Sequence, residues 1–259
     1  SLVRLGNPSS LKGCTETAQI LKEKITEKKK IRIIGDYDID GVNSTYILYR
    51  ALSRCGAVVD YEIPDRMKDG YGLNVDLLRY AVEEGVDTIL TCDNGISAIE
   101  EIAYAKECGM TVLVTDHHEP LFAGEGESGK EHAVRVVSES EQRIYLLPPA
   151  DQIVNPKQPF CPYPYKKLCG AAVAFKLVAA LEGGDYEGAF EQYAELLALA
   201  TIADVVQLVG ENRTLVRLGL LRMRETDNLG LHALIEASLS PQAKLDSVSV
   251  AYSLVPRLN

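Results

Sequence analysis

Residues 31–41 read IRIIGDYDIDG, an apolar run followed at once by acidic residues between two glycines. The apolar part predicts a buried β-strand that breaks at the first glycine. The loop after it carries three aspartates at alternate positions, Asp36, Asp38 and Asp40. A helical pattern over residues 43–56 comes next. The stretch therefore predicts a strand, an acidic loop and a helix, in that order.

The same alternation continues along the chain. Further strands are predicted at 57–63, 86–95 (strand, then loop) and 111–118, and further helices at 15–30, 74–84 and 97–108. Strands that alternate with helices of about ten residues are typical of βαβ units. The fold class expected is α/β, a mostly parallel sheet flanked by helices.

The second half of the chain departs from this rhythm. Residues 121–147 are polar and contain Gly and Ser, which favours a surface insertion, with a hairpin as one form of it. Residues 155–165 are rich in proline and predict an extended loop. Helical patterns at 169–182, 189–203 and 212–237 predict a helical C-terminal portion. We expect one domain over residues 1–259.

The composition is that of a soluble protein without a membrane span. The start of the chain has no signal-peptide pattern, and no apolar run reaches the ~18 residues of a membrane helix. The six cysteines form no CxxC pair, so we expect reduced thiols and a cytoplasmic location. The net charge of −10 argues against a large nucleic-acid footprint. It is compatible with a metal site, whose carboxylate ligands add to the acidity.

Polar clusters follow three of the predicted strands. The first is the aspartate loop, the second is Asp93-Asn94, and the third is Asp116-His117-His118. Open α/β sheets place their sites beyond the carboxyl ends of the strands. If the strands are adjacent and parallel, the three clusters meet in space.

Crowded carboxylates predict a bound cation. Like charges at this spacing repel, and a divalent metal with hard oxygen ligands, Mg²⁺ or Mn²⁺, relieves the repulsion. The neighbouring imidazoles favour Mn²⁺. An EF-hand is the rival motif, but its twelfth position is Ile47 where a glutamate is required, and a strand precedes the loop. A solvated acidic turn remains as the other alternative.

Asp204 lies in the otherwise apolar run LALATIADVVQL. A buried carboxylate without a partner is costly, so a metal or a basic partner is expected. The alternative to a metal is an ion pair between Asp204 and Arg213.

Four segments together resemble a known family. In chain order, GDYDIDG, CDNG, TDHH and ATIADVVQL resemble the successive motifs of the DHH phosphoesterase superfamily. Within it, the similarity is closest to the RecJ-type single-stranded-DNA exonucleases. The segments at 154–177 and 256–259 (PRLN) also resemble RecJ-type sequence.

The resemblance implies a two-metal site that uses Mn²⁺ or Mg²⁺, with Asp93 as the bridge between the ions. The implied metal ligands are Asp38, Asp40, Asp93, His117 and Asp204. Asp36 and Asp116 match supporting acidic positions in the catalytic centre, and Asp36 is also a candidate direct ligand. His118 matches a residue that faces the substrate phosphate, with hydrogen bonding in support of the ligands as its alternative. Asn94 and Arg257 are further candidate substrate contacts.

The resemblance also implies an activity: 5′-to-3′ degradation of single-stranded DNA to mononucleotides, in DNA repair and recombination. Two alternatives stay open. One is hydrolysis of short oligonucleotides, cyclic dinucleotides or pyrophosphate, and the other is a non-catalytic DHH-fold scaffold. The family continues past PRLN into a smaller domain that binds the strand. We therefore expect the gene product to extend beyond Asn259, and residues 1–259 alone to bind single-stranded DNA weakly.

Overall fold

The centre of the protein is a five-stranded parallel sheet. The computed structural model describes residues 5–65, 72–124, 130–240 and 242–259. The strand order is β2-β1-β3-β4-β8, and every neighbouring pair is parallel. The strands are β1 Lys30–Ile34, β2 Val58–Glu62, β3 Thr88–Cys92, β4 Thr111–Thr115 and β8 Gln152–Val154. The predicted α/β class with a parallel sheet is confirmed.

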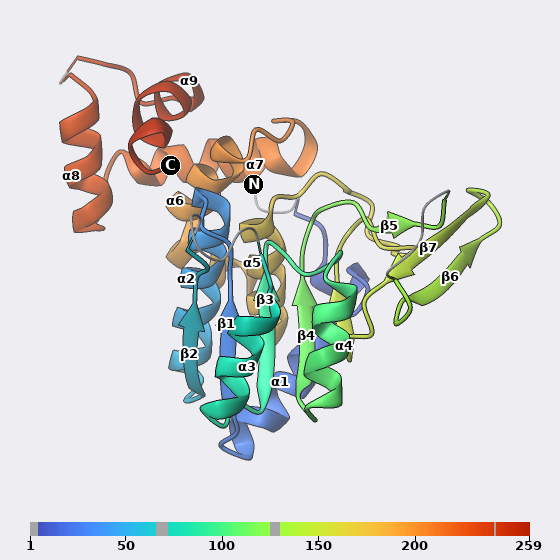
Figure 1. Ribbon diagram of the computed structural model, residues 1–259. Coiled ribbons are helices and arrows are strands. Elements are labelled where there is room, and N and C mark those ends of the chain that lie inside the picture. The colour runs from blue at the N-terminus through green and yellow to red at the C-terminus, as the bar shows by residue number, and fades with distance from the viewer. Residues whose placement is uncertain (1–4, 66–71, 125–129, 241) are drawn as a thin grey trace.

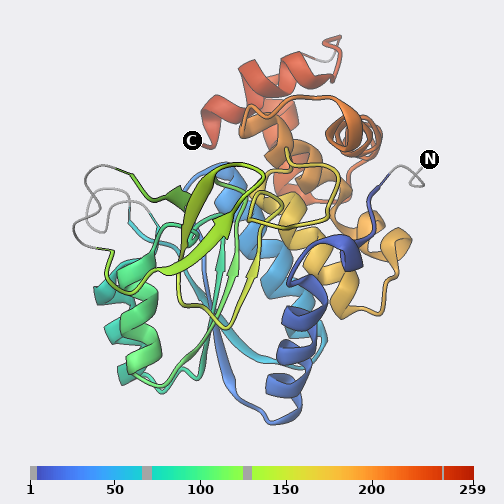
Figure 2. The same cartoon turned by 90° about the vertical axis from the view of Figure 1, so that its right-hand side faces the viewer.

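Helices cover both faces of the sheet (Figures 1 and 2). One face packs against α1 Cys14–Thr26, α2 Ile39–Arg54 and α5 Gly170–Leu181, with Ile31 and Ile33 of β1 in that core. The other face packs against α3 Val75–Glu83 and α4 Ile99–Glu107, with Ile34 in that core. Successive strand residues point to opposite faces, so strands covered on both sides read as continuous apolar runs.

The C-terminal portion is helical, as predicted. Its elements are α6 Tyr186–Ala203, α7 Gly210–Met223, α8 Leu229–Ser238, α9 Ser247–Ser249, a π-helical turn Val250–Leu254 and a 3₁₀ turn Val255–Arg257. The pattern over 212–237 is not one helix but two. Asn228 starts α8, because its side chain accepts a hydrogen bond from the N–H of Leu231 at 3.0 Å.

The insertion forms a small antiparallel sheet beside the main body (Figure 1). Its order is β5-β7-β6, from β5 Leu121–Phe122, β6 Val134–Ser138 and β7 Arg143–Leu147. The predicted hairpin is therefore present as β6 and β7, with β5 added on the far side of β7. Part of the predicted insertion, residues 125–129, lies outside the described residues.

Two boundaries differ from the predictions. Helix α2 begins at Ile39 rather than at residue 43, because Asp38 caps it by accepting from the N–H of Gly41 at 2.8 Å. Strand β8 was not predicted, since three residues carry no periodicity. Residues 155–165 contain no helix or strand, as expected for the proline-rich loop.

All six cysteines are free thiols. Within the described ranges, no helix combines the length and the apolar character needed to span a membrane.

Candidate metal centre

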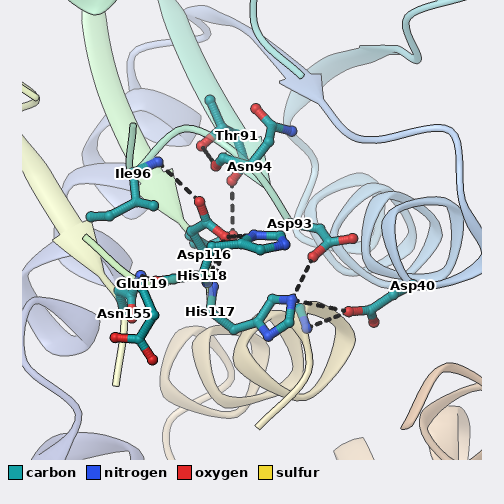
Figure 3. A network of polar contacts seen from close by, with 12 residues as sticks. Asp40, Thr91, Asp93, Asn94, Ile96, Asp116, His117, His118, Glu119 and Asn155 are labelled. Atoms are coloured by element: carbon teal, nitrogen blue, oxygen red, sulfur yellow. Dashed lines mark hydrogen bonds and ion pairs between the residues drawn. The ribbon is translucent and has the colours of Figure 1, made fainter. Parts of the chain in front are cut away.

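The polar clusters meet at the carboxyl end of the central strands (Figure 3). Three groups of residues there bring ligand atoms within 4.8 Å of one another. They are Asp36 with Asp38 and Asp93, Asp40 with His117 and Asp204, and Asp93 with His117 and His118. The groups overlap through Asp93 and His117. All five predicted metal ligands therefore belong to one cluster, and Asp36 joins them.

The acidic loop after β1 supplies three of these carboxylates. Asp36 is 1% exposed and lies two residues after the end of β1 at Ile34. Asp38 is the N-cap of α2, and Asp40 lies in the first turn of that helix. A side chain on Gly41 would come within 2.5 Å of the Asp36 carbonyl oxygen. The glycine therefore allows the tight turn that keeps the aspartates together.

Asp40 is held by the N-terminus of a different helix. Its two carboxylate oxygens accept hydrogen bonds from the backbone N–H groups of Gly170 at 2.6 Å and of Ala171 at 2.8 Å. These are the first two residues of α5. Free N–H groups and the helix dipole favour a negative charge at this position. The contact spans 130 residues of sequence, and no motif signals it.

Asp93 occupies the middle of the cluster in an uncommon backbone conformation. Its φ is +61°, in the left-handed region, and its side chain is almost completely buried. Its N–H donates to the carbonyl of Thr115 at 3.1 Å, which ties the end of β3 to the end of β4. A non-glycine residue in this region is strained, and strain of this kind concentrates at functional sites.

His117 joins the two halves of the cluster. Its Nε2 lies 3.0 Å from Oδ1 of Asp93 and 3.7 Å from Oδ2 of Asp40. Its Nδ1 lies 3.7 Å from Oδ2 of Asp204. Asp204 is the C-cap of α6, so that helix brings a carboxylate from the C-terminal portion to the sheet. His117, rather than Arg213, is the neighbour of Asp204.

Asp116 organises the loop that carries the two histidines. Its Oδ2 accepts from the N–H of Ile96 at 2.9 Å. Its Oδ1 accepts from the N–H groups of His117 at 2.7 Å and His118 at 3.2 Å, and lies 2.7 Å from Nδ1 of His118. Both oxygens are thus engaged within the protein. Asp116 is absent from the possible ligand groups, and its supporting role in the site stays a prediction.

Burial and mutual repulsion disfavour charge on the clustered carboxylates. Burial is the largest cause in each case. It raises the pKa of Asp36 to about 6, and it raises the pKa values of Asp40, Asp93 and Asp204. Neighbouring aspartates raise all four pKa values further.

Asp116 and His118 behave differently, because each supports the charge of the other. Burial alone would raise the pKa of Asp116. The hydrogen bond from His118 and the charge on that ring outweigh it, and the pKa is lowered. The same hydrogen bond raises the pKa of His118.

The donor set fits a divalent cation. Oδ1 of Asp36 and Oδ2 of Asp204 are buried and, among the residues described, have no hydrogen-bond partner. A buried carboxylate oxygen without a partner is costly, and a cation among these residues would remove that cost. Carboxylates with one imidazole suit Mn²⁺, and carboxylates alone suit Mg²⁺.

The two predicted substrate contacts lie in different surroundings. The Asn94 side chain is buried and donates to the carbonyls of Ile34 at 3.1 Å and Cys92 at 2.9 Å, so it joins the ends of β1 and β3. Arg257 is exposed, and its Nε donates to the carbonyl of Ser253 at 3.2 Å. The PRLN segment does reach the site, since Asn259 Oδ1 accepts from the N–H of Ile39 at 3.3 Å. Substrate binding by Asn94 and Arg257 stays a prediction.

Known proteins are similar to this chain in sequence and in fold. The single-stranded-DNA-specific exonuclease RecJ of Bacillus subtilis is 42% identical over 253 residues, which cover 98% of this chain and 29% of that protein. A crystal structure of exonuclease RecJ bound to manganese superimposes with a TM-score of 0.76 at 36% identity, covering 95% of this chain and 56% of that one. RecJ of Thermus thermophilus in complex with Mg²⁺ gives a TM-score of 0.60 at 31% identity, covering 95% of this chain and 28% of that one.

The chain thus spans less than a third of the length of the Bacillus subtilis relative. The sequence model described as the DHH family, N-terminal domain, matches residues 30–201, which hold all the residues of the acidic loop, both histidines and Asp93. With the motifs, the parallel sheet and this match in agreement, the chain belongs to the DHH family.

Proposed function

We propose that residues 1–259 form one DHH-type phosphoesterase unit that hydrolyses phosphodiester bonds of single-stranded DNA with two divalent cations. The observation that carries the proposal is a pair of neighbouring ligand groups, one of which contains Asp93. One consists of Asp36, Asp38 and Asp93, and the other of Asp40, His117 and Asp204. Similar proteins solved with Mn²⁺ and with Mg²⁺ support the choice of ions.

Asp93 is the residue that would serve both ions in this proposal. It belongs to the first group, and its Oδ1 lies 3.0 Å from His117 of the second. When bound, a pair of divalent cations generates a nucleophile from water at neutral pH and stabilises the charge that develops on the phosphate. The aspartates would hold the ions in place, and the buried position of Asp36, Asp40 and Asp93 would limit access of bulk water to them.

His118 is the residue placed to meet the substrate. Its side chain is 44% exposed, whereas that of His117 is 8% exposed. The contact between Nδ1 and the Asp116 carboxylate fixes the ring and supports a proton on it. We propose that His118 contacts the phosphate or gives a proton to the leaving oxygen.

The substrate proposal rests on the relatives. The relatives are named single-stranded-DNA-specific exonuclease, and the similarity covers nearly the whole of this chain. We propose release of mononucleotides from the 5′ end. The net charge of −10 predicts that residues 1–259 alone bind the strand weakly, because acidic side chains outnumber the basic ones that neutralise phosphates.

The proposal is tested by assaying single-stranded DNA, a dinucleotide and pyrophosphate side by side with Mn²⁺. A 5′-labelled strand should lose its label first, as a mononucleotide, and Asp93→Ala should abolish the reaction. Cleavage of the dinucleotide or of pyrophosphate alone would favour the small-substrate alternative. A purified protein that takes up no Mn²⁺ in calorimetric titration would favour the scaffold. Unchanged Mn²⁺-dependent cleavage by Asp93→Ala would overturn the proposal.

A further inference from the structure

Gly170 stands between two of the clustered carboxylates and touches both. Its N–H donates to Oδ2 of Asp40 at 2.6 Å. On its other side, a Cβ built on Gly170 would lie 2.7 Å from both Cβ and Oδ1 of Asp93, and 2.8 Å from Cγ. Real Cβ atoms are essentially never this close to other heavy atoms, so a larger residue forces a displacement.

Neither neighbour of Gly170 can move at low cost. Asp93 is fixed through its backbone, because it directly follows β3 and its N–H is bonded to the carbonyl of Thr115 in β4. The close contact involves its Cβ, which is not the flexible end of a long side chain.

Helix α5 is equally fixed. Eleven of its twelve residues are buried, and it packs on α1, α2 and α6. Close-packed interiors resist the shift that an extra methyl group would require.

The same helix end lacks a cap of its own. Cys169, the N-cap of α5, makes no side-chain capping bond. The carboxylate of Asp40 takes the place of the cap: one oxygen accepts from the N–H of Gly170 and the other from the N–H of Ala171. Asp40 is 1% exposed and, being in the first turn of α2, lies on a second rigid element. The N-terminus of α5 therefore fixes Asp40 by hydrogen bonds and Asp93 by contact.

We propose that Gly170 is a positioning residue: the missing side chain lets one helix end hold Asp40 and abut Asp93, which sets the separation of the two carboxylates for the metal pair. This inference rests on the proposed function for the presence of the two ions. For the separation of Asp40 and Asp93 it rests on packing alone. A residue with a side chain at position 170 disturbs both halves of the cluster at once. The two ligand groups then no longer lie at the distance that two ions sharing Asp93 require.

The steric part is tested without metal by a double-mutant cycle in EDTA. Gly170→Ala should lower the thermal midpoint of the wild-type protein. In the Asp93→Gly background, Gly170→Ala should lower the thermal midpoint much less, because the Asp93 side-chain atoms that the new methyl group would meet are absent. Glycine also tolerates the positive φ at position 93. Equal losses in the two backgrounds would overturn the inference. If Gly170→Ala alone does not fold, a folded Gly170→Ala/Asp93→Gly protein gives the same support, and an unfolded one overturns the inference.

The metal part is tested by titrating Mn²⁺ into the folded proteins, with calorimetry for stoichiometry and electron paramagnetic resonance for coupling between ions. Wild type should bind two coupled ions. Gly170→Ala should either lose the coupling or bind Mn²⁺ about tenfold more weakly or worse. Ala179→Gly, a buried change further along α5, is the matched control and should keep both properties. Two coupled ions of unchanged affinity in Gly170→Ala would overturn the positioning role. A wild type that binds no Mn²⁺ would overturn the proposed function instead, while the EDTA cycle still decides the spacing.

Discussion

Nε2 of His117 and Oδ1 of Asp93 lie 3.0 Å apart, although the two residues follow different strands. The contact is possible because β3 and β4 are adjacent, parallel and in register up to Cys92 and Thr115. Asp93 then turns into the left-handed region at φ +61°, which is an uncommon conformation for aspartate. The fold therefore places a strained, buried carboxylate beside an imidazole, where a cation would stabilise both.

Asp93→Asn should separate metal binding from folding. Without metal, the variant removes a carboxyl group whose charge is disfavoured by burial and by the neighbouring aspartates. The thermal midpoint should therefore rise by about 2 to 4 °C, the shift for 1 kcal/mol in a domain of this size. With Mn²⁺, wild type should gain stability and the variant should gain little. Differential scanning fluorimetry with and without Mn²⁺ measures both effects. Asp76→Asn, at an exposed position on α3, is the control and should leave both midpoints within about 1 °C. A lower midpoint for Asp93→Asn without metal would contradict the repulsion argument.

The stability of the metal-free protein should depend on pH in the direction set by its raised pKa values. The pKa of Asp36 is about 6 in the folded protein, above the ~3.9 of an unfolded aspartate. Between these values the folded state binds more protons, so the free energy of unfolding falls as the pH rises from about 4 to about 6. A bound cation lowers the pKa and reverses the sign. The midpoint gain from Mn²⁺ should therefore be larger at pH 7.5 than at pH 5. An equal gain at both pH values would show that these carboxylates do not hold the ion.

His118→Asn should slow catalysis more than it weakens metal binding. The ring is half exposed and its Nδ1 is tied to Asp116, so the variant removes a positioned proton donor or phosphate contact. A loss of about 10²- to 10⁴-fold in kcat is typical of such a residue. Calorimetry should still detect two Mn²⁺ ions with affinity within about tenfold of wild type. Loss of one ion would instead identify His118 as a metal ligand, in line with its closeness to Asp93 and His117.

Much of the fold and of the site could be predicted because both depend on local signals. Strands covered on both faces appear as apolar runs, and the acidic and histidine residues directly follow them. The rule that sites lie beyond the carboxyl ends of parallel strands then brought Asp40, Asp93 and His117 together correctly. Asp204 was predicted to need a partner because a carboxylate in an apolar run is costly to bury, and it lies beside His117.

The remaining features depend on contacts between distant parts of the chain. The hydrogen bond from Gly170 to Asp40 joins the first turn of α2 to the start of a helix 130 residues later. In the sequence, a glycine at the start of an apolar helix looks like an ordinary helix start. Helix α2 begins four residues before its apolar pattern, because Asp38 caps the helix and this stabilises a first turn that is polar. Strand β8 has only three residues, and it pairs with β4 after the chain returns from the insertion, so its presence depends on a contact with a strand far back in the sequence.

A second buried network, away from the metal centre, supports the placement of α5. Lys176 of α5 is completely buried and forms an ion pair with Glu211 of α7, and its Nζ also donates to the carbonyl of Gly6 at 2.8 Å. Tyr163 donates to the other oxygen of Glu211 at 2.7 Å. Burial lowers the pKa of Lys176. The charge of Glu211 and its hydrogen bond to Lys176 raise this pKa, but burial has the larger effect. The pair therefore links α5 to α7 and to the start of the chain.

Lys176→Met should destabilise the protein by about 3 to 5 kcal/mol, because it leaves the Glu211 carboxylate buried without its counter-charge. Lys176→Met/Glu211→Leu should recover much of that loss, since an apolar pair of similar volume has no charge to desolvate. Urea unfolding measures both. Arg79→Met breaks an exposed pair with Asp76 on α3 and should change stability by less than about 1 kcal/mol. A single and a double variant that are equally unstable would show that the packing of Lys176, rather than its charge, holds α5 against α7.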